Sequence, residues 1–579
     1  MDKKGWDCLD IILVSGDAYI DHPSFGVAVI GRVLESAGYR VGIIPQPDWR
    51  STDDVCRLGK PRLFFGVTAG NTDSMVANYT ANKRQRRADD YSPGRMAGLR
   101  PERSCIVYSN MIRRFFKDVP IVLGGIEASM RRLAHYDYWS HSVRRSILLD
   151  SRADILVYGM GEAQILEIAR RMHEKSAHAS LAGITGTALV LSDITGLDDF
   201  VLIPSFEEVA TDFKKFNEAF SLAYNEADPI RGRTIVQKHA ERYVVLYPPA
   251  SPLTAPELDR IHELKYARGW HPAYNKKGGV PAYETVRFSV ISHRGCPGEC
   301  SFCSLSLHQG RIIQSRSRSS ILREVRLLTQ GRDFKGTISD IGGATGNLYA
   351  AHCTHWNSKG ACKARQCLMP VKCRNLSMGF DESLRLWGDV MKIPGVRHVF
   401  MGSGVRYDLL LDIAARDYFD ALCREHVSGQ LKIAPEHVSG TVLECMNKPP
   451  VEVYERFIEK FMECGKKAGK KQYPVNYFIS AHPGSTLENA LELALYLAHR
   501  GLHPEQVQDF IPLPMTRSGC MYYTGIDPFT GQGVYVARTF KERKMQRALI
   551  QYQQPKNRAL VMEALKILEK QHLRRIFYP

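Results

Sequence analysis

Short apolar segments that alternate with segments of helical periodicity constrain the fold of this chain more than any other feature. Apolar segments of strand length, separated by helices, predict parallel strands in a sheet that is covered on both faces. The alternation runs through residues 1–175 and resumes after residue 280, while 180–280 contains hairpin-like segments and Pro-rich turns. The sequence therefore predicts an α/β protein with at least two domains.

The first domain is expected within residues 1–280, as an N-terminal Rossmann-like, doubly wound sheet with an extension and a linker. In such a sheet, ligands bind in a crevice at the carboxyl ends of the strands. Gly124, Gly125 and 159–161 are candidates to line that crevice. Strands are expected at 9–14, 41–44, 63–67, 121–123 and 155–157, with hairpin-like pieces at 187–191 and 234–247.

Residues 281–540 repeat the pattern more regularly, and six strand–helix units predict a partial (β/α)6 barrel, with a doubly wound sheet as the alternative. Both folds place the site at the carboxyl ends of the strands. The last helix has a predicted capping box, Ser485 with Glu488, and 541–579 is expected to form a basic helical tail. The expected strands are 286–292, 336–341, 397–401, 430–434, 475–480 and 506–511, and the expected helices are 320–330, 381–392, 408–426, 451–468 and 486–500.

Three cysteines directly follow the first strand of this second series. Cys296, Cys300 and Cys303 have the spacing C-x3-C-x2-C. Three thiolates on one tight loop can bind three irons of an iron–sulfur cube and leave the fourth iron open to another ligand. A structural zinc site would need a fourth protein ligand, for which His308 is available.

Four more cysteines lie in an insertion at 350–375, beside His352 and His355. The insertion has few apolar residues and little core of its own, which indicates that a metal orders it. Four thiolates suit a second iron–sulfur cluster and a structural zinc ion alike. These candidate ligands are Cys353, Cys362, Cys367 and Cys373.

The net charge of +17 is concentrated in four segments, 82–103, 310–335, 353–374 and 541–579. Two of them follow the first two strands of the second series, so they are expected near the mouth of the site. Clustered cations concentrate anions, which indicates a negatively charged substrate such as RNA or a nucleotide-like molecule. Because no apolar stretch is long enough for a secretion signal or a membrane span, we expect a cytoplasmic protein with reduced thiols and no membrane partner.

An aromatic residue, Phe302, precedes the last cysteine of the C-x3-C-x2-C loop, as in the signature of radical S-adenosylmethionine (radical SAM) enzymes. The wider sequence resembles the YgiQ family of that superfamily over nearly its whole length. The similar stretches are 124–132, 135–139, 158–162, 340–343, 434–437, 480–484 and 508–512.

This resemblance implies that Cys296, Cys300 and Cys303 bind a 4Fe–4S cluster whose open iron chelates S-adenosylmethionine (SAM). An electron donor such as flavodoxin or ferredoxin would then drive formation of a 5′-deoxyadenosyl radical, which abstracts a hydrogen atom from a substrate. Gly342 and Gly343 stand where the superfamily has a Gly-Gly-Glu motif, and glycine lets the backbone approach the methionine part closely. Ala344 and Thr345 follow here instead of Glu.

Further polar residues are expected at the ends of the strands, where barrel enzymes place their chemistry. The expected cofactor-binding residues are Gly342, Gly343, Ser403, Lys432 and Phe302, and the expected catalytic residues are Arg406, Glu436 and His437, with His482 as a further candidate.

The first domain resembles the cobalamin-binding-type domains that precede many radical enzymes. Their Asp-x-His-x-x-Gly motif is not visible at the end of its first strand, and Asp21 and His22 lie close to the following helix. We therefore expect a Rossmann-like domain without cobalamin.

Two functions from different classes fit these patterns. One is a radical SAM enzyme with an auxiliary metal site, and the other is a nucleic-acid-binding metalloprotein with structural zinc at its cysteines. Iron content and SAM cleavage discriminate between them.

Overall fold

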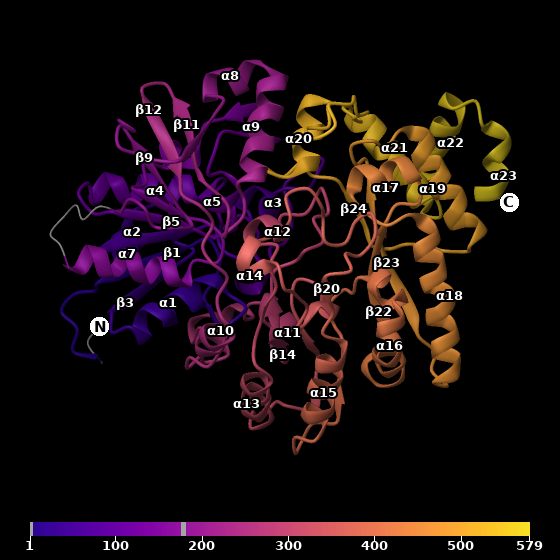
Figure 1. The fold of residues 1–579 in the computed structure, drawn as a ribbon, viewed down its shortest axis with the longest axis horizontal. Helices are drawn as coiled ribbons and strands as arrows, with labels where there is room; N and C mark the ends of the chain where they lie inside the picture. Colours follow the sequence, from indigo (N-terminus) through magenta and orange to yellow (C-terminus); the bar gives the residue numbers. More distant parts are fainter. Residues whose placement is uncertain (1–3, 175–180, 579) are drawn as a thin grey trace. The chain divides into compact units, whose positions relative to one another are not determined.

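The computed structural model describes residues 4–174 and 181–578 and divides into two compact units (Figure 1). Unit 1 contains residues 1–287 together with the short segments 307–310 and 357–360. Unit 2 contains 288–306, 311–356 and 361–579. Among the described residues, no helix is long and apolar enough to cross a membrane.

A nine-stranded sheet forms the centre of unit 1. Its strands are β1 (Ile11–Ser15), β3 (Val41–Pro45), β4 (Phe64–Thr68), β5 (Ile121–Gly124), β8 (Ile155–Val157), β9 (Thr187–Leu191), β10 (Phe200–Ile203), β11 (Thr234–His239) and β12 (Arg242–Leu246). Five parallel neighbours follow the order β3-β1-β4-β5-β8, with Ile11 beside both Val41 and Phe64. This is the flavodoxin-like strand order. The β11–β12 hairpin and β9 continue the sheet in antiparallel pairing, and β10 is added parallel to β11 at the edge.

The faces on which the helices of unit 1 lie follow from this strand order. The chain reverses its direction across the sheet at β1, so right-handed connections place α1 (Gly26–Ser36) and α4 (Ser104–Phe115) on opposite faces. α1 shares its face and an apolar core with α7 (Glu162–Glu174). Smaller elements are β2 (Ile20–Asp21), α2 (Asp53–Cys56), α3 (Ser74–Asn78), α5 (Gly125–Met130), β6 (His135–Asp137), β7 (Ser142–Arg144), α6 (Ile147–Ser151), α8 (Phe206–Thr211), α9 (Phe213–Asn225), α10 (Ala255–His262), β13 (Gly269–Trp270) and α11 (Ala282–Val286).

A buried ion-pair network lies at the carboxyl ends of β1 and β4, where this strand order reverses. The Arg100 guanidinium donates to Asp17 Oδ1 at 2.6 Å, to Asp89 Oδ2 at 3.1 Å and to the Gly16 carbonyl at 3.1 Å. The two strand ends also touch, since a Cβ atom on Gly16 would lie 2.3 Å from the Ala69 carbonyl oxygen. Flavodoxin-like sheets bind their ligand at this point, and here the Arg100 side chain and its partners occupy it.

Unit 2 is built from parallel strands that pair in the order of the chain. The strands are β14 (Ser289–Ile291), β17 (Thr337–Ile338), β18 (Asp340–Gly342), β21 (His398–Val399), β22 (Gln430–Glu436), β23 (Tyr473–Ser480) and β24 (Val507–Asp509). β14 pairs with β18, β17 with β21, β22 with β23 and β23 with β24, and a parallel bridge joins Val405 to Ile433. A strand order that never reverses its direction across the sheet is that of a singly wound sheet. It differs from the doubly wound strand order of unit 1.

Helices pack along these strands through one large apolar core and two smaller ones. The large core includes Phe419 together with Phe457 and Phe461 of α18. In one smaller core, α19 packs on β23 and β24. In the other, α21 packs on α19, and α22 packs in turn on α21 (Figure 1). The helices are α12 (Leu305–His308), α13 (Arg318–Thr329), α14 (Trp356–Lys359), α15 (Phe380–Met391), α16 (Arg416–Ala421), α17 (Gly440–Met446), α18 (Val451–Lys467), α19 (Leu487–His499), α20 (Arg517–Thr524), α21 (Phe540–Ile550), α22 (Arg558–Ile567) and α23 (Arg574–Phe577).

Two local expectations were wrong. The helix predicted at 408–426 is broken into short turns, α16 and a π-helical turn, because Asp412 has an extended backbone and its side chain accepts from the Ala414 N–H. The capping box of α19 is formed by Thr486 and Asn489. The Ser485 hydroxyl instead donates to Gln546 Oε1 at 2.9 Å, so a long-range partner displaces the cap by one residue.

We expect Arg100→Met to destabilise unit 1, because it leaves Asp17 and Asp89 buried without their cation. Loss of one partner of a buried pair costs about 3–5 kcal/mol. Burial already raises the pKa of Asp17 to about 6, and Arg100 opposes that rise. In the variant the folded state therefore binds a proton more tightly than the unfolded state does, so the loss in free energy of unfolding shrinks between pH 8 and pH 5. Urea unfolding at both pH values measures it.

The matched control is Arg95→Met, which removes an exposed pair with Asp90. It should change the free energy of unfolding by less than about 1 kcal/mol at either pH. An equal loss for Arg100→Met at pH 8 and pH 5 would contradict the account.

Candidate functional site

The C-x3-C-x2-C loop connects the short strand β15 (His293–Arg294) to α12. β15 pairs antiparallel with β16 (Gln314–Ser315). Gly295 starts the loop with a φ of 90°, and a Cβ atom there would lie 2.4 Å from the Ile312 carbonyl oxygen. Glycine is required here for two reasons: the backbone is left-handed, and it touches the backbone of the neighbouring segment.

Backbone hydrogen bonds from later elements hold the loop. The Ser301 N–H donates to the Met446 carbonyl at 3.0 Å, and Asn447 Nδ2 donates to the Glu299 carbonyl at 2.9 Å. The Ser518 N–H of α20 donates to the Ser301 carbonyl at 2.9 Å. Because these bonds use main-chain atoms of the loop, its position does not depend on the cysteine side chains.

The three cysteines of the loop are half-buried. Burial raises the pKa of Cys303 to about 12 and also raises the pKa of Cys296, with the nearby thiol of Cys300 adding to both shifts. A buried thiolate is unfavourable without a cation, so at neutral pH these thiols would stay protonated unless a metal bound them.

Arg406 is the predicted site residue that the structure brings to this loop. Its Nη1 lies 3.8 Å from Cys300 Sγ, and its Nε and Nη2 donate to the Asp408 carboxylate at 3.0 and 2.8 Å. A Cβ atom on Gly298 would lie 2.8 Å from Arg406 Nη1 and 3.2 Å from Cys296 Sγ. Because Gly298 has no side chain, the guanidinium and the sulfur atom can both lie beside it.

A second group of predicted residues gathers around Asp340, which the sequence analysis did not single out. The Gly402 and Ser403 N–H groups donate to Asp340 Oδ1 at 2.9 and 3.0 Å, and the Ser403 hydroxyl donates to Oδ2. Lys432 Nζ donates to the Gly402 carbonyl at 3.0 Å, and a Cβ atom on Gly342 would meet Ser403 Oγ at 2.7 Å. Burial raises the pKa of Asp340. A carboxylate inside a predicted strand was the signal that could have revealed it.

Gly343 packs against the strand that leads into the cysteine loop. A Cβ atom on it would lie 2.5 Å from the His293 carbonyl oxygen. The His293 ring connects the same region to the next turn, since Nε2 is bonded to the Thr345 carbonyl at 2.9 Å. The Gly342–Gly343 backbone is therefore in direct contact with residues at the start of the loop.

Glu436 and His437 lie at the end of β22. Glu436 has a φ of 69°, its carboxylate lies 3.9 Å from Lys448 Nζ, and burial raises its pKa. Its charge also acts on the thiol of Cys303. Burial lowers the pKa of His437 to about 3, and its Nδ1 accepts from the Ser439 N–H at 3.0 Å. His437 is therefore neutral at physiological pH and carries its proton on Nε2.

His482 and Phe302 pack beside the loop. The Phe302 ring meets the His482 ring edge-on at a centroid distance of 6.0 Å. His482 Nδ1 is bonded to the Pro483 carbonyl at 2.7 Å, so its Nε2 accepts from the Ser518 hydroxyl at 2.7 Å. Burial lowers the pKa of His482 to about 3. Both ring nitrogens are engaged, which makes His482 a support for the loop.

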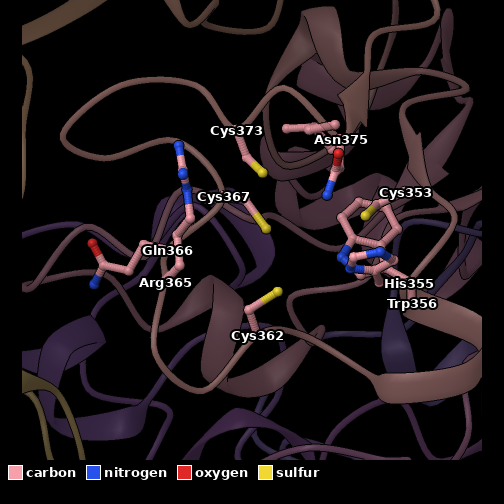
Figure 2. Close-up of a pocket in the computed structure, with 10 residues that line it drawn as sticks. Cys353, His355, Trp356, Cys362, Arg365, Gln366, Cys367, Cys373 and Asn375 are labelled. Carbon is pink, nitrogen blue, oxygen red and sulfur yellow. The ribbon is translucent and has the colours of Figure 1, made fainter.

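The insertion forms a small pocket of its own in unit 2 (Figure 2). Its base is a two-stranded ribbon of β19 (His352–Cys353) and β20 (Leu376–Ser377), in which Cys353 pairs with Leu376. Burial, followed by the charge of Glu299 on the C-x3-C-x2-C loop, raises the pKa of Cys367 to about 12. The two cysteine groups are therefore close enough to interact electrostatically. The pocket is lined by all four predicted ligands, Cys353, Cys362, Cys367 and Cys373, together with His355.

Comparison with known proteins places these features in a class. The family description Radical SAM N-terminal matches residues 1–289, and a domain of unknown function (DUF3362) matches 505–574. A UPF0313 protein of Methanocella arvoryzae is 53% identical over 561 residues, which cover 97% of this chain and 93% of that protein. A UPF0313 protein of Clostridium botulinum is 51% identical over 563 residues, which cover 97% of this chain and 88% of that protein.

Among solved structures, the cobalamin-dependent S-adenosylmethionine radical enzyme OxsB with aqua-cobalamin bound has a similar fold. The TM-score is 0.51 with 10% identity, over 98% of this chain and 76% of that one. Fold and family together define a radical SAM protein. Within that class, the identity to its relatives shows that the chain belongs to the UPF0313 family, also called YgiQ.

The residues of the cysteine loop fit the ligand set of an iron–sulfur cluster, because three half-buried cysteines stand on one loop. The guanidinium of Arg406 lies 3.8 Å from Cys300 Sγ and, beside Gly298, next to Cys296 Sγ as well. His308, the candidate fourth ligand for zinc, has its Nδ1 bonded to Ser129 Oγ at 3.1 Å, an arrangement that leaves Nε2 as its remaining donor atom for a metal. Across residues 4–174 and 181–578, no three His, Cys, Asp or Glu side chains converge as they would around one metal ion.

The residues of unit 1 do not fit cobalamin. His22 is buried, its Nδ1 accepts from the Ser24 N–H at 3.1 Å, and the Arg268 guanidinium lies 3.3 Å from its Nε2. Burial lowers its pKa to about 3. At the carboxyl ends of β1 and β4, the Arg100 network takes the place where a cofactor would enter.

We expect Asn447→Gly to loosen the C-x3-C-x2-C loop without unfolding α17. Glycine keeps the φ of 56° with which Asn447 ends the helix, but the side-chain bond to the Glu299 carbonyl is lost. One such bond stabilises by about 1 kcal/mol. Hydrogen exchange of metal-free protein should therefore be about five times faster in 296–303.

Exchange in α18 should not change, and it provides the internal reference. Equal acceleration in both segments, or none in the loop, would show that Asn447 does not hold the loop in place.

Proposed function

We propose that this protein is an enzyme that binds a 4Fe–4S cluster at Cys296, Cys300 and Cys303 and cleaves SAM reductively. The observation that carries the proposal is the loop itself, which holds three half-buried thiols by its backbone at the start of a series of parallel strands. Three cysteines leave one iron for an exchangeable ligand. We further propose that the parallel strands of unit 2 close into a partial (β/α)6 barrel around this site.

When bound, the cluster supplies the electron that converts SAM to methionine and a 5′-deoxyadenosyl radical able to abstract a hydrogen atom. The chain's own residues would bind and orient SAM. The backbone of Gly342 and Gly343 would accept the methionine part. Ser403, held by Asp340, and Lys432, held by the Gly402 carbonyl, would complete that subsite. Phe302 packs the loop against His482.

Three residues are proposed for the catalytic side of the site. Arg406 offsets the negative charge of the thiolates, because its guanidinium lies beside Cys300. Glu436 can carry a proton on its carboxyl group, since burial raises its pKa. His437 can donate from Nε2, because its Nδ1 already accepts from Ser439.

A second metal centre at Cys353, Cys362, Cys367 and Cys373 completes the proposed cofactor set. An electron donor such as flavodoxin or ferredoxin would supply the reducing equivalents. None of the fourteen cysteines, all of which the structure describes, forms a disulfide. This agrees with a reducing compartment, and we propose a cytoplasmic location.

Reconstituted anaerobically and reduced with dithionite, the protein should convert SAM to 5′-deoxyadenosine. Cys296→Ala/Cys300→Ala/Cys303→Ala should lower formation to the level of a protein-free reaction, because the variant has no ligands left for the cluster. Chromatography of the nucleoside products measures it.

The matched control is Cys56→Ala, which changes a half-buried cysteine of α2 in unit 1 and should leave the rate unchanged. Colourless protein that contains zinc and forms no 5′-deoxyadenosine would instead favour the nucleic-acid-binding metalloprotein.

The substrate class that we propose is anionic, with RNA or a nucleotide-like molecule as the form to test. Part of the basic segment 310–335 is internal, since Arg316 is buried against Glu324 and Arg311 against Glu299. The cations of the insertion differ, because Lys363, Arg365 and Arg374 are exposed. These three are therefore the better candidates to contact an anion.

Bulk tRNA should bind to the protein with an affinity that falls as salt is raised, because neutralised phosphates release counterions. Lys363→Ala/Arg365→Ala/Arg374→Ala should reduce the salt slope by about three. Lys466→Ala/Lys467→Ala/Lys471→Ala, in the last turn of α18 and just after it, removes three charges elsewhere and serves as the control for net charge. Absence of binding at low salt, or the same slope in both variants, would exclude RNA contact through the insertion.

A further inference from the structure

The pocket of the insertion brings together four thiols from different parts of one short insertion. Cys353 comes from β19, Cys362 and Cys367 come from the segment after α14, and Cys373 lies just before β20. Figure 2 shows the sulfur atoms of Cys362, Cys367 and Cys373 along one side of the pocket, with Cys353 and His355 on the other. All four cysteines line this one pocket.

Backbone contacts explain how this arrangement arises. The β19–β20 ribbon fixes Cys353 beside Leu376, and the Leu376 N–H donates to the Cys373 carbonyl at 3.0 Å. The Cys373 N–H in turn donates to the Cys367 carbonyl at 2.8 Å. Three of the four cysteines are therefore connected by main-chain hydrogen bonds, independently of their thiols.

These thiols differ from the cysteines of the apolar core. Cys105, Cys423 and Cys520 are buried, whereas Cys362 is exposed and the other three of the insertion are half-buried. An ordinary core cysteine packs against apolar neighbours. Here the cysteines line a pocket, although Cys353, Cys367 and Cys373 also pack against the edge of the core of unit 2, in which Trp356 and Leu368 are buried.

The spacing of the thiols distinguishes between the metals that four cysteines can hold. Zinc would need four sulfur atoms at about 2.3 Å from a single point. In the described part of the chain, no three potential ligands converge in that way. An iron–sulfur cluster needs a wider arrangement, because each thiolate binds a different iron at the rim of the cluster. A pocket lined by four thiols fits this second arrangement.

The charge of the insertion suits thiolates. Residues 353–374 contain five basic side chains and no acidic one. Lys372 Nζ donates to the Leu376 carbonyl at 3.2 Å, which holds its ammonium group at the ribbon that carries Cys353. Cations near thiolates lower the cost of the negative charge that a cluster with four cysteine ligands carries.

We infer that Cys353, Cys362, Cys367 and Cys373 hold an iron–sulfur cluster, and not zinc, as the second metal centre of this chain. The inference rests on the proposed second metal centre and assigns its chemical class. It does not depend on SAM cleavage, because its ligands are separate from those of the C-x3-C-x2-C loop.

The test uses the full chain reconstituted anaerobically with iron, sulfide and zinc all present. Cys296→Ala/Cys300→Ala/Cys303→Ala leaves the insertion intact, so iron and sulfide bound to this variant report the second centre alone. We expect about half of the wild-type iron and sulfide and visible absorption of a cluster. Adding Cys362→Ala/Cys373→Ala to that variant should remove the remainder, whereas adding Cys56→Ala should not.

Each contrary result has its own meaning. About one zinc per chain without sulfide in the loop variant would overturn the iron–sulfur assignment and keep a metal centre. No metal in that variant would overturn both. Loss of SAM cleavage in wild-type protein, with iron still retained by the insertion, would overturn the proposed function and leave this inference standing. Because the decisive variant does not alter the insertion, misfolding of the Cys362→Ala/Cys373→Ala protein would not affect the result.

Discussion

The partial burial of three thiols on one backbone-anchored loop is the constraint on which the rest of unit 2 depends. A thiolate removed from water needs a positive partner, and here burial raises the pKa values of Cys296 and Cys303. The guanidinium of Arg406 reaches Cys300 but is shared with Asp408. One shared cation does not balance three thiolates, so the loop is stable either with protonated thiols or with a bound metal.

The C-terminal segment has a structural role in this arrangement. α20 supplies Ser518, which binds both the Ser301 carbonyl and His482, and α21 supplies Gln546, which binds Ala481 and Ser485 after β23. Both helices lie in the 505–574 segment that matches the domain of unknown function. The segment therefore holds the cysteine loop and the end of β23 in place. The segment is therefore not a separate tail, and a truncation before α20 would remove these contacts.

The sequence could predict what local patterns determine. Strand–helix alternation predicted the parallel strands of both units, and cysteine spacing directed attention to the two groups that the structure places in one unit. It could not predict the cluster around Asp340, because Ser403 and Lys432 reach it from strands far along the chain. The predictions of one helix at 408–426 and of Ser485 in the capping box of α19 were wrong for related reasons. Asp412 has its own local hydrogen bond, and Ser485 has a distant partner in Gln546. In each case a specific side-chain contact outweighed the helical pattern.

The central claim is that the C-x3-C-x2-C loop leaves one iron open to SAM. Pulsed electron paramagnetic resonance of the reduced protein with SAM labelled with ¹⁵N at its amino group tests it directly, in the Cys362→Ala/Cys373→Ala variant so that only the loop cluster contributes. The account predicts a hyperfine coupling between the cluster and the labelled nitrogen, which disappears without SAM. A reduced cluster whose spectrum is unchanged by saturating labelled SAM would contradict it.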